Sequence, residues 1–68
     1  MSHHVIRAGV SACVLDAMSD HEASAALGLP IQTVRRVIRE LCVHWQARNR
    51  VALALQLQRI ARAPEVPA

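Results

Sequence analysis

The chain has 68 residues, a formal net charge of +3 and a sequence pI near 10.2, and every one of its eight strongly basic residues is arginine. A chain so short makes one small domain and buries only about 60% of the surface that its unfolded form exposes, so such chains commonly rely on a metal, a disulfide or a partner subunit. An apolar content of 53% with one aromatic residue, Trp45, excludes a core of bulky side chains, and no strand-length run alternates apolar with polar residues. We therefore predict an all-α domain, whose basic balance favours nucleic acid or an acidic surface as its partner.

The sequence carries no pattern that points to a membrane, a metal or a catalytic site. Its start lacks the long apolar core of a secretory signal, and no apolar run reaches the ~20 residues that span a bilayer. Cys13 and Cys42 have no CxxC spacing, so we interpret them as small buried hydrophobes of a reducing compartment, with a disulfide or a metal role as the alternative. No histidine has a spacing that places a nucleophile beside a base. We expect a cytoplasmic protein that is not an enzyme and has no cofactor.

A first helix is predicted over residues 8–17, and residues 1–7 before it are expected to be flexible. Apolar side chains recur along this helix at spacings of three and four, which places them on one side. They are Val10, Cys13, Val14 and Ala17.

A tight turn follows the second predicted helix, residues 20–27. Ser19 and Glu22 have the Ser-x-x-Glu spacing of a capping box at the start of this helix. Gly28 suits the left-handed residue that ends a helix, and Pro30 favours the start of the next one. A short helix, a tight turn with glycine and a further helix are together typical of a helix-turn-helix unit.

The third predicted helix, residues 31–45, separates apolar from basic side chains. At about 100° per residue, one arc holds Val34, Val37, Ile38, Leu41, Cys42 and Trp45, and the opposite face holds Arg35, Arg36 and Arg39. Arginine presents a planar fork of donors that matches guanine O6 and N7, and recognition helices read bases mainly with their N-terminal residues. The pattern predicts that the three arginines read bases. The alternative is an ordinary solvated face, in which Arg36 pairs with Glu40.

Three further residues are predicted to bind DNA phosphates. Thr33 has a hydroxyl at the start of the third helix, close to backbone N–H groups that also favour anions. Arg48 and Arg50 flank the start of the next helix and could clamp a phosphate there.

The fourth predicted helix, residues 50–62, is apolar on two faces. Asn49 is its expected N-cap, and the tail 63–68, with two prolines, is expected to be disordered. One apolar stripe consists of Leu53, Leu57, Ile60 and Ala61, and a second consists of Val51 and Leu55. We interpret one face as core and the other as the contact with a second copy, with the interface at Val51, Leu55 and Arg62. The alternative is that the other three helices cover both faces.

The runs TVRRVIREL and ARNRVALAL resemble the C-terminal DNA-binding domain of the LuxR/GerE transcription regulators. That domain reads S-x-x-E-I-A-x-x-L-G-[IL]-S-x-x-T-V-K/R and later K-L-G-V-x-N-R-x-x-A, and the similarity extends from Val10 to Ala61. The matching residues are Ser19, Glu22, Leu27, Gly28, Leu29, Thr33, Val34, Arg35, Asn49, Arg50 and Ala54. The resemblance implies a four-helix LuxR-type helix-turn-helix domain with its arginines at base-reading positions, Thr33 at a phosphate and the last helix at the dimer surface. The segment ALGLPIQTVR is also similar to region 4 of sigma factors.

The chain departs from the family pattern in several places. Pro30 replaces the usual serine, Val37 stands where histidine is common, and Ala23 replaces a larger isoleucine. The segment His44-Trp45-Gln46-Ala47 replaces K-L-G-V, and the spacing between the first two helices is one residue short. These changes remove a side-chain cap and a phosphate contact and recast the connection into the last helix around its tryptophan.

We expect a small stand-alone bacterial transcription regulator that binds double-stranded DNA as a homodimer. The alternative is a protein-interaction module that pairs with another regulator or an RNA polymerase subunit without binding DNA itself. The arginine face favours the first function, and the two apolar faces of the last helix favour the second.

Overall fold

The computed structural model describes residues 2–62, which form four helices and no strand. The helices are α1 (His3–Leu15), α2 (Asp20–Leu27), α3 (Ile31–His44) and α4 (Arg50–Ala61). The all-α prediction is confirmed for this part of the chain, and the predicted tail 63–68 lies outside the described residues. None of the four helices is long and apolar enough to cross a membrane.

Helix α1 begins five residues earlier than its apolar pattern predicts, so the expectation of flexible residues 1–7 is wrong from His3 onward. Ser2 caps the helix, because its hydroxyl accepts the Val5 N–H at 3.2 Å. Ile6 then packs against the core, and Arg7 reaches Glu40 on α3. Tertiary contacts therefore hold a first turn that the sequence periodicity does not include.

The other end of α1 is also displaced from the prediction, because the helix ends at Leu15. Ala17 has a left-handed φ of 57°, and the N–H groups of Ala17 and Met18 return to the carbonyls of Val14 and Cys13. This paired hydrogen bonding is a helix-ending Schellman motif. It turns Ala17 out to solvent, so the prediction that Ala17 lies on the buried side is wrong.

Helix α2 starts with the predicted capping box. The Ser19 hydroxyl accepts the Glu22 N–H at 3.1 Å, and the Glu22 carboxylate accepts the Ser19 N–H at 3.0 Å. The bond from the Ser19 backbone lowers the pKa of the Glu22 carboxyl below its ordinary value, since it favours the charged form. The carboxylate also lies at the positive end of the helix dipole.

A left-handed glycine sets the turn between α2 and α3. Gly28 has φ 65°, and both its N–H and that of Leu29 bond to the Ser24 carbonyl. The Ser24 hydroxyl donates to the Leu29 carbonyl and closes the turn from the other side. Pro30 then occupies the N-cap of α3 without a side-chain hydrogen bond. The tight turn predicted for this segment is present.

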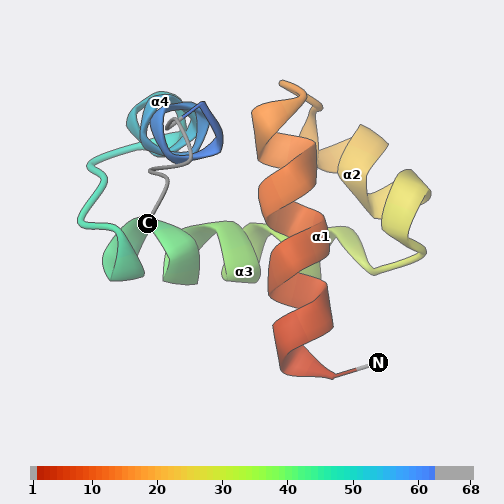
Figure 1. Ribbon diagram of the computed structural model, residues 1–68. Coiled ribbons are helices and arrows are strands. Elements are labelled where there is room, and N and C mark those ends of the chain that lie inside the picture. Colours follow the sequence, from red (N-terminus) through yellow and green to blue (C-terminus); the bar gives the residue numbers. More distant parts are fainter. Residues whose placement is uncertain (1, 63–68) are drawn as a thin grey trace.

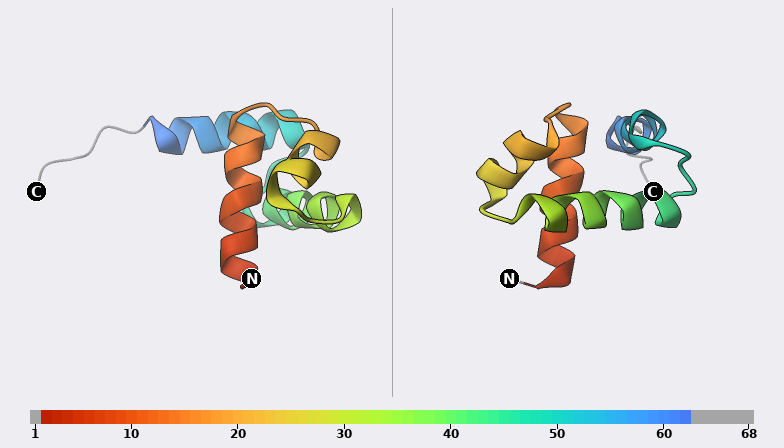
Figure 2. Two further views of the ribbon diagram at one scale, coloured as in Figure 1. Left: turned by 90° about the vertical axis from the view of Figure 1, so that its right-hand side faces the viewer. Right: turned by 180° about the vertical axis from the view of Figure 1, so that it is seen from behind.

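Helix α1 lies at the centre of the fold and contacts all three other helices (Figure 1). Helix α3 crosses α1 on one side, as the view from behind shows, and the last turns of α4 project beyond the body (Figure 2). The core consists of aliphatic side chains, one small alanine and one cysteine. Its buried members are Val10, Cys13, Val14, Ala23, Val34, Val37, Ile38, Leu41, Leu53 and Leu57.

The projection of α4 changes which of its side chains are buried. Leu53 and Leu57 enter the core as predicted, but Ile60 is 51% exposed and Ala61 is exposed, so their assignment to the buried stripe is wrong. The other three helices do not extend far enough to cover the last turn of α4. Val51 and Leu55 are also exposed, which excludes the alternative that the other three helices cover both faces.

Helix α3 ends at His44, one residue before its predicted end, in a second left-handed turn. Gln46 has φ 54°, and the N–H groups of Gln46 and Ala47 bond to the carbonyls of Val43 and Cys42. This repeats the Schellman arrangement that ends α1, again without glycine. Trp45 lies half-buried against the core beside this turn.

We predict that Gln46→Gly raises the free energy of unfolding by about 0.5–1 kcal/mol, because glycine adopts a left-handed φ without the clash of a Cβ. Gln58→Gly is the matched control, since it makes the same replacement inside α4 and should lower stability by a similar amount. Urea denaturation followed by circular dichroism measures both. Equal losses for the two variants would contradict strain at Gln46.

Candidate nucleic-acid interface

The outward face of α3 carries a line of four residues along the whole helix. Gln32, Arg36, Arg39 and Val43 are separated by four, three and four residues, the spacing of one helical face, and all four are exposed. The inward face of the same helix is wholly taken up by the core. The core therefore fixes which side of α3 is presented to a partner.

The N-terminal half of this face borders an open groove of about 580 Å³ at the turn between α2 and α3. Most of its lining is polar or basic, and the three arginines predicted to read bases are all present. The lining residues are Pro30, Gln32, Thr33, Arg35, Arg36 and Arg39. The structure thus brings Thr33 and the three arginines to one surface.

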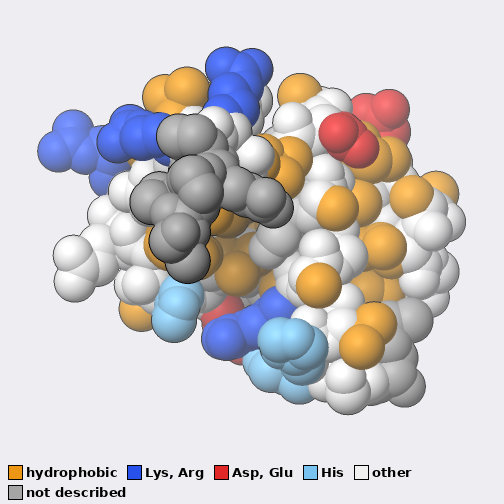
Figure 3. All heavy atoms as spheres, in the orientation of Figure 1, with side chains coloured by type: hydrophobic (Ala, Val, Ile, Leu, Met, Phe, Trp, Pro, Cys, Tyr) orange, Lys and Arg blue, Asp and Glu red, His pale blue; other side chains and the backbone are white. Residues whose placement is uncertain are grey.

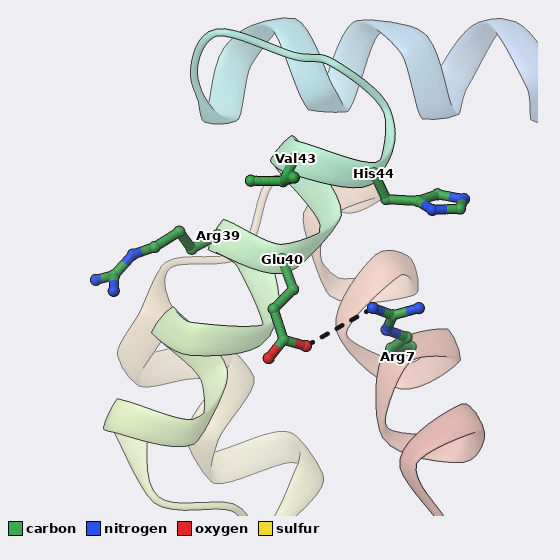
Figure 4. Close-up of a pocket in the computed structure, with 5 residues that line it drawn as sticks. All are labelled: Arg7, Arg39, Glu40, Val43 and His44. Carbon is green, nitrogen blue, oxygen red and sulfur yellow. Dashed lines mark ion pairs between the residues drawn. The ribbon is translucent and has the colours of Figure 1, made fainter.

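Figure 4 shows that side chains from the C-terminal half of α3 lie on two different sides of the helix. Arg39 and Val43 point to one side of the helix, whereas Glu40 and His44 lie on the side of α1. Val43 is 75% exposed, which leaves an aliphatic side chain uncovered beside an arginine. The outward face therefore ends in a basic and an apolar residue.

The one acidic residue of α3, Glu40, is engaged with α1. The Glu40 carboxylate lies 3.5 Å from His3 Nε2 and 3.7 Å from Arg7 Nη2, both on α1, and Figure 4 shows the pair with Arg7. The ion pair between Arg36 and Glu40, expected in the alternative of a solvated face, does not form within residues 2–62. Arg36 and Arg39 have no acidic partner in that part of the chain.

Arg35 differs from its two neighbours because it has a partner inside the fold. Its Nε lies 3.3 Å from Oδ2 of Asp20, the first residue of α2. The Arg35 side chain is still 54% exposed. One edge of its guanidinium is therefore held, while the rest of the group faces solvent.

Arg50 has an intramolecular role that the sequence did not reveal. Its Nη1 donates to Asp20 Oδ1, and its Nη2 donates to the carbonyl of Met18. These bonds tie the start of α4 to the start of α2, two helices whose backbones do not approach each other closely within the described residues. Because both terminal nitrogens already have acceptors, a phosphate would have to compete with the fold for Arg50.

The two other predicted phosphate contacts lie at opposite ends of α3. Thr33 is half-buried in its first turn, and its N–H bonds to the Pro30 carbonyl at 3.0 Å. Arg48 is exposed in the segment that joins α3 to α4. A phosphate bound by Thr33 and a phosphate bound by Arg48 would therefore be separated by about the length of α3.

Three residues of this surface were not predicted from the sequence: Asp20, Gln32 and Val43. Gln32 and Val43 could have been found, since they share the helical face of Arg36 and Arg39 at the spacing given above. Asp20 could not. An acidic residue in a first helical turn reads as ordinary support for the helix dipole, and its partners lie 15 and 30 residues away.

A second uncovered surface lies on α4. Val51 is 69% and Leu55 is 54% exposed, and Gln58 and Arg62 continue the line at the spacing of one helical face. Figure 3 shows basic side chains gathered over α4 and its ends. Helix α4 therefore has a short apolar stripe, and it carries basic residues at its start and in its last turn.

Comparisons with protein-family models, with curated proteins and with solved structures found no match to this chain. The resemblance that residues 10–61 bear to LuxR-type domains therefore stays a prediction from the sequence.

We predict that Arg50→Ala lowers the free energy of unfolding by about 1–2 kcal/mol, because it removes two charge-assisted bonds from a partly exposed site and leaves Asp20 with Arg35 alone. Arg48→Ala removes the same charge two residues away, where the side chain is exposed, and should cost less than about 0.5 kcal/mol. Urea denaturation compares the two variants. A loss at Arg48 equal to that at Arg50 would argue against the structural role of Arg50.

Proposed function

We propose that this chain is a small transcription regulator that binds double-stranded DNA by placing the outward face of α3 in the major groove. The observation that carries the proposal is the pair Arg36 and Arg39, exposed on one helical face with no acidic partner in the described chain. A tight turn fixed by Gly28 and Ser24 sets this helix against α2. These features together support a helix-turn-helix reader.

The other two residues of the outward face extend the same chemistry. The Gln32 amide has the donor and acceptor that pair with adenine N7 and N6, and it lies in the first turn of the helix, where base contacts concentrate. The exposed methyl groups of Val43 suit the thymine methyl. A face with arginine, glutamine and valine therefore favours a mixed site containing both G·C and A·T pairs.

Phosphate contacts would hold this helix in register. Thr33 and the N-terminal N–H groups of α3 favour one phosphate, and Arg48 at the far end of the helix favours another. Arg50 is left out of this set, because its guanidinium bridges Asp20 and Met18.

One of two departures from the family pattern supports a LuxR-type domain in this structure. Gln46 has a left-handed φ at the place where the family pattern has glycine, so the backbone turn into α4 is the one that glycine would allow. Val37 is 1% exposed, so the residue at the family's histidine position serves the core here. The glycine position therefore has the backbone turn that glycine would adopt, whereas the histidine position has no access to a phosphate.

The uncovered face of α4 supports a homodimer through Val51, Leu55 and Arg62. A stripe at this spacing is self-complementary when two copies pair about a two-fold axis. Two aliphatic side chains per copy bury far less than the roughly 1,200–2,000 Å² of a stable interface. We therefore expect weak pairing in free solution and stronger pairing on DNA that carries two half-sites.

A protein-interaction module is the second candidate function. The observation that favours it is that the molecular surface leaves three aliphatic side chains more than half exposed: Val43 on α3, and Val51 and Leu55 on α4. Such a surface would suit another regulator or an RNA polymerase subunit. The experiment below separates the two functions, because only a DNA reader enriches particular sequences.

We predict that Arg36→Ala and Arg39→Ala each reduce the preference for the selected site by about 5- to 100-fold, since a bidentate base contact is worth ~1–3 kcal/mol. The site is obtained by selecting bound duplexes from a random pool, and affinities are measured by fluorescence anisotropy at several salt concentrations. Arg59→Ala is the control, because it removes the same charge from an exposed position on α4. It should leave the site preference unchanged.

A random pool from which the wild-type chain enriches no sequence would contradict DNA reading. Equal loss of preference in the Arg36, Arg39 and Arg59 variants would also contradict it, because the effect would then be one of net charge. Stable capture of a protein partner by a chain that retains no DNA would favour the interaction module.

We predict that Leu55→Glu abolishes cooperative binding to duplexes with two half-sites and leaves single-site affinity within about threefold, because it places a charge in the paired stripe. Val5→Glu is the matched control, since Val5 is an aliphatic side chain of α1 that is 52% exposed, close to the 54% of Leu55. Sedimentation velocity with and without DNA gives the oligomeric state. Unchanged cooperativity in the Leu55 variant would refute the α4 interface.

A further inference from the structure

We propose that Asp20 is a positioning residue that gives Arg35 its base preference. This inference rests on the proposed function, and it concerns how Arg35, which lines the groove at the turn between α2 and α3, is held. Asp20 is the first residue of α2 and directly follows the N-cap residue Ser19, so the start of the helix fixes its backbone. Its side chain is 26% exposed, the least exposed of the ion-paired side chains in residues 2–62.

The contact with Asp20 uses only one edge of the Arg35 guanidinium. Oδ2 of Asp20 accepts from Nε of Arg35 at 3.3 Å, and no residue between 2 and 62 accepts from its two terminal nitrogens. Those nitrogens are the pair that fits O6 and N7 of guanine end-on. The anchored Nε restricts the rotation of a long side chain before DNA arrives, so less side-chain entropy is lost when the base contact forms.

Arg50 makes this arrangement possible next to DNA. Its Nη1 bonds the second carboxylate oxygen of Asp20, so one acidic residue is shared by two guanidinium groups. The cluster keeps a net positive charge, and Arg35 stays attractive to DNA although it is paired. Arg50 also bonds the Met18 carbonyl, which fixes the far side of the cluster to the segment between α1 and α2.

Asp20 therefore has two opposite effects on DNA binding. Its negative charge near the recognition surface weakens attraction to every phosphate and so lowers affinity for all sequences. Its hold on Arg35 disfavours the rotamers with which this arginine would bind phosphates at random. Arg36 and Arg39, which have no acidic partner within residues 2–62, are free to contact both bases and phosphates. Arg35 is thereby restricted to a base contact, whereas Arg36 and Arg39 contribute both to base reading and to general affinity.

The test compares Asp20→Asn with Glu22→Gln. Both changes remove one negative charge from the first turn of α2, but only the first touches Arg35. The base pair that Arg35 reads is found first, as the position where Arg35→Ala loses preference in a selection from random duplexes. Discrimination at that base pair, affinity for random DNA and the urea midpoint are then measured for each variant.

Asp20→Asn should lose about 5- to 100-fold in discrimination at that base pair and bind random DNA as well as or better than the wild-type chain. Glu22→Gln should keep discrimination within about twofold, and Asp20→Asn should have no further effect on discrimination in a chain that also carries Arg35→Ala. Asp20→Glu retains the charge for Arg50 and moves the Nε anchor by one methylene. It should lose discrimination as well, which keeps the test valid if Asp20→Asn is too unstable to assay.

Every other outcome contradicts the proposed function, the positioning role of Asp20, or both. A wild-type chain without sequence preference overturns the proposed function and this inference with it. A wild-type chain with a preference that Asp20→Asn and Asp20→Glu retain overturns this inference alone. Loss of affinity by the same factor for all sequences also overturns it, because Asp20 would then only stabilise the fold.

Discussion

The packing of three helices around α1 is the constraint on which the rest of the structure depends. The buried side chains are mostly aliphatic and small, and Val10, Val34 and Leu53 from three different helices are completely excluded from solvent. Because no aromatic side chain is among the buried residues, the helices must approach closely, as the buried Ala23 of α2 allows. The inner face of α3 is used up by this packing. Its opposite face is therefore held outward in one orientation, which a reader of the DNA groove requires.

Such a small apolar core leaves a role for polar links between helices. Asp20 joins α2 to α3 and to α4, and Glu40 joins α3 to α1. Exposed ion pairs add little stability one by one, but these connect elements that are far apart in the sequence and restrict their relative motion. Each link also decides which basic groups remain available. Arg36 and Arg39 face solvent without an acidic partner in the described chain, whereas Arg35 is held at one edge and Arg50 is enclosed at both terminal nitrogens.

In the proposed regulator, DNA reading and pairing with a second copy belong to two different helices. Helix α3 presents the basic face that would read bases, and α4 presents the short apolar face that would meet a second copy. The Arg50 bridge connects the start of α4 to Asp20 and, through it, to Arg35. A change in the position of α4 on pairing would thus act directly on the residues that hold an arginine of the reading surface. Both faces are small, so binding energy would come from several modest contacts rather than from one dominant one.

The sequence by itself determined the local features of this protein. The four helices, the capping box at Ser19, the left-handed Gly28 and the two faces of α3 all follow from spacing and capping, because they depend on neighbours within about four residues. Tertiary structure decided the rest. It extended α1 to His3, left Ile60 outside the core and gave Gln46 a left-handed turn. It also paired Asp20 with residues 15 and 30 positions away. Periodicity shows which way a side chain points along its own helix, but which group it meets depends on how the helices cross, and that is fixed only when the whole core is packed.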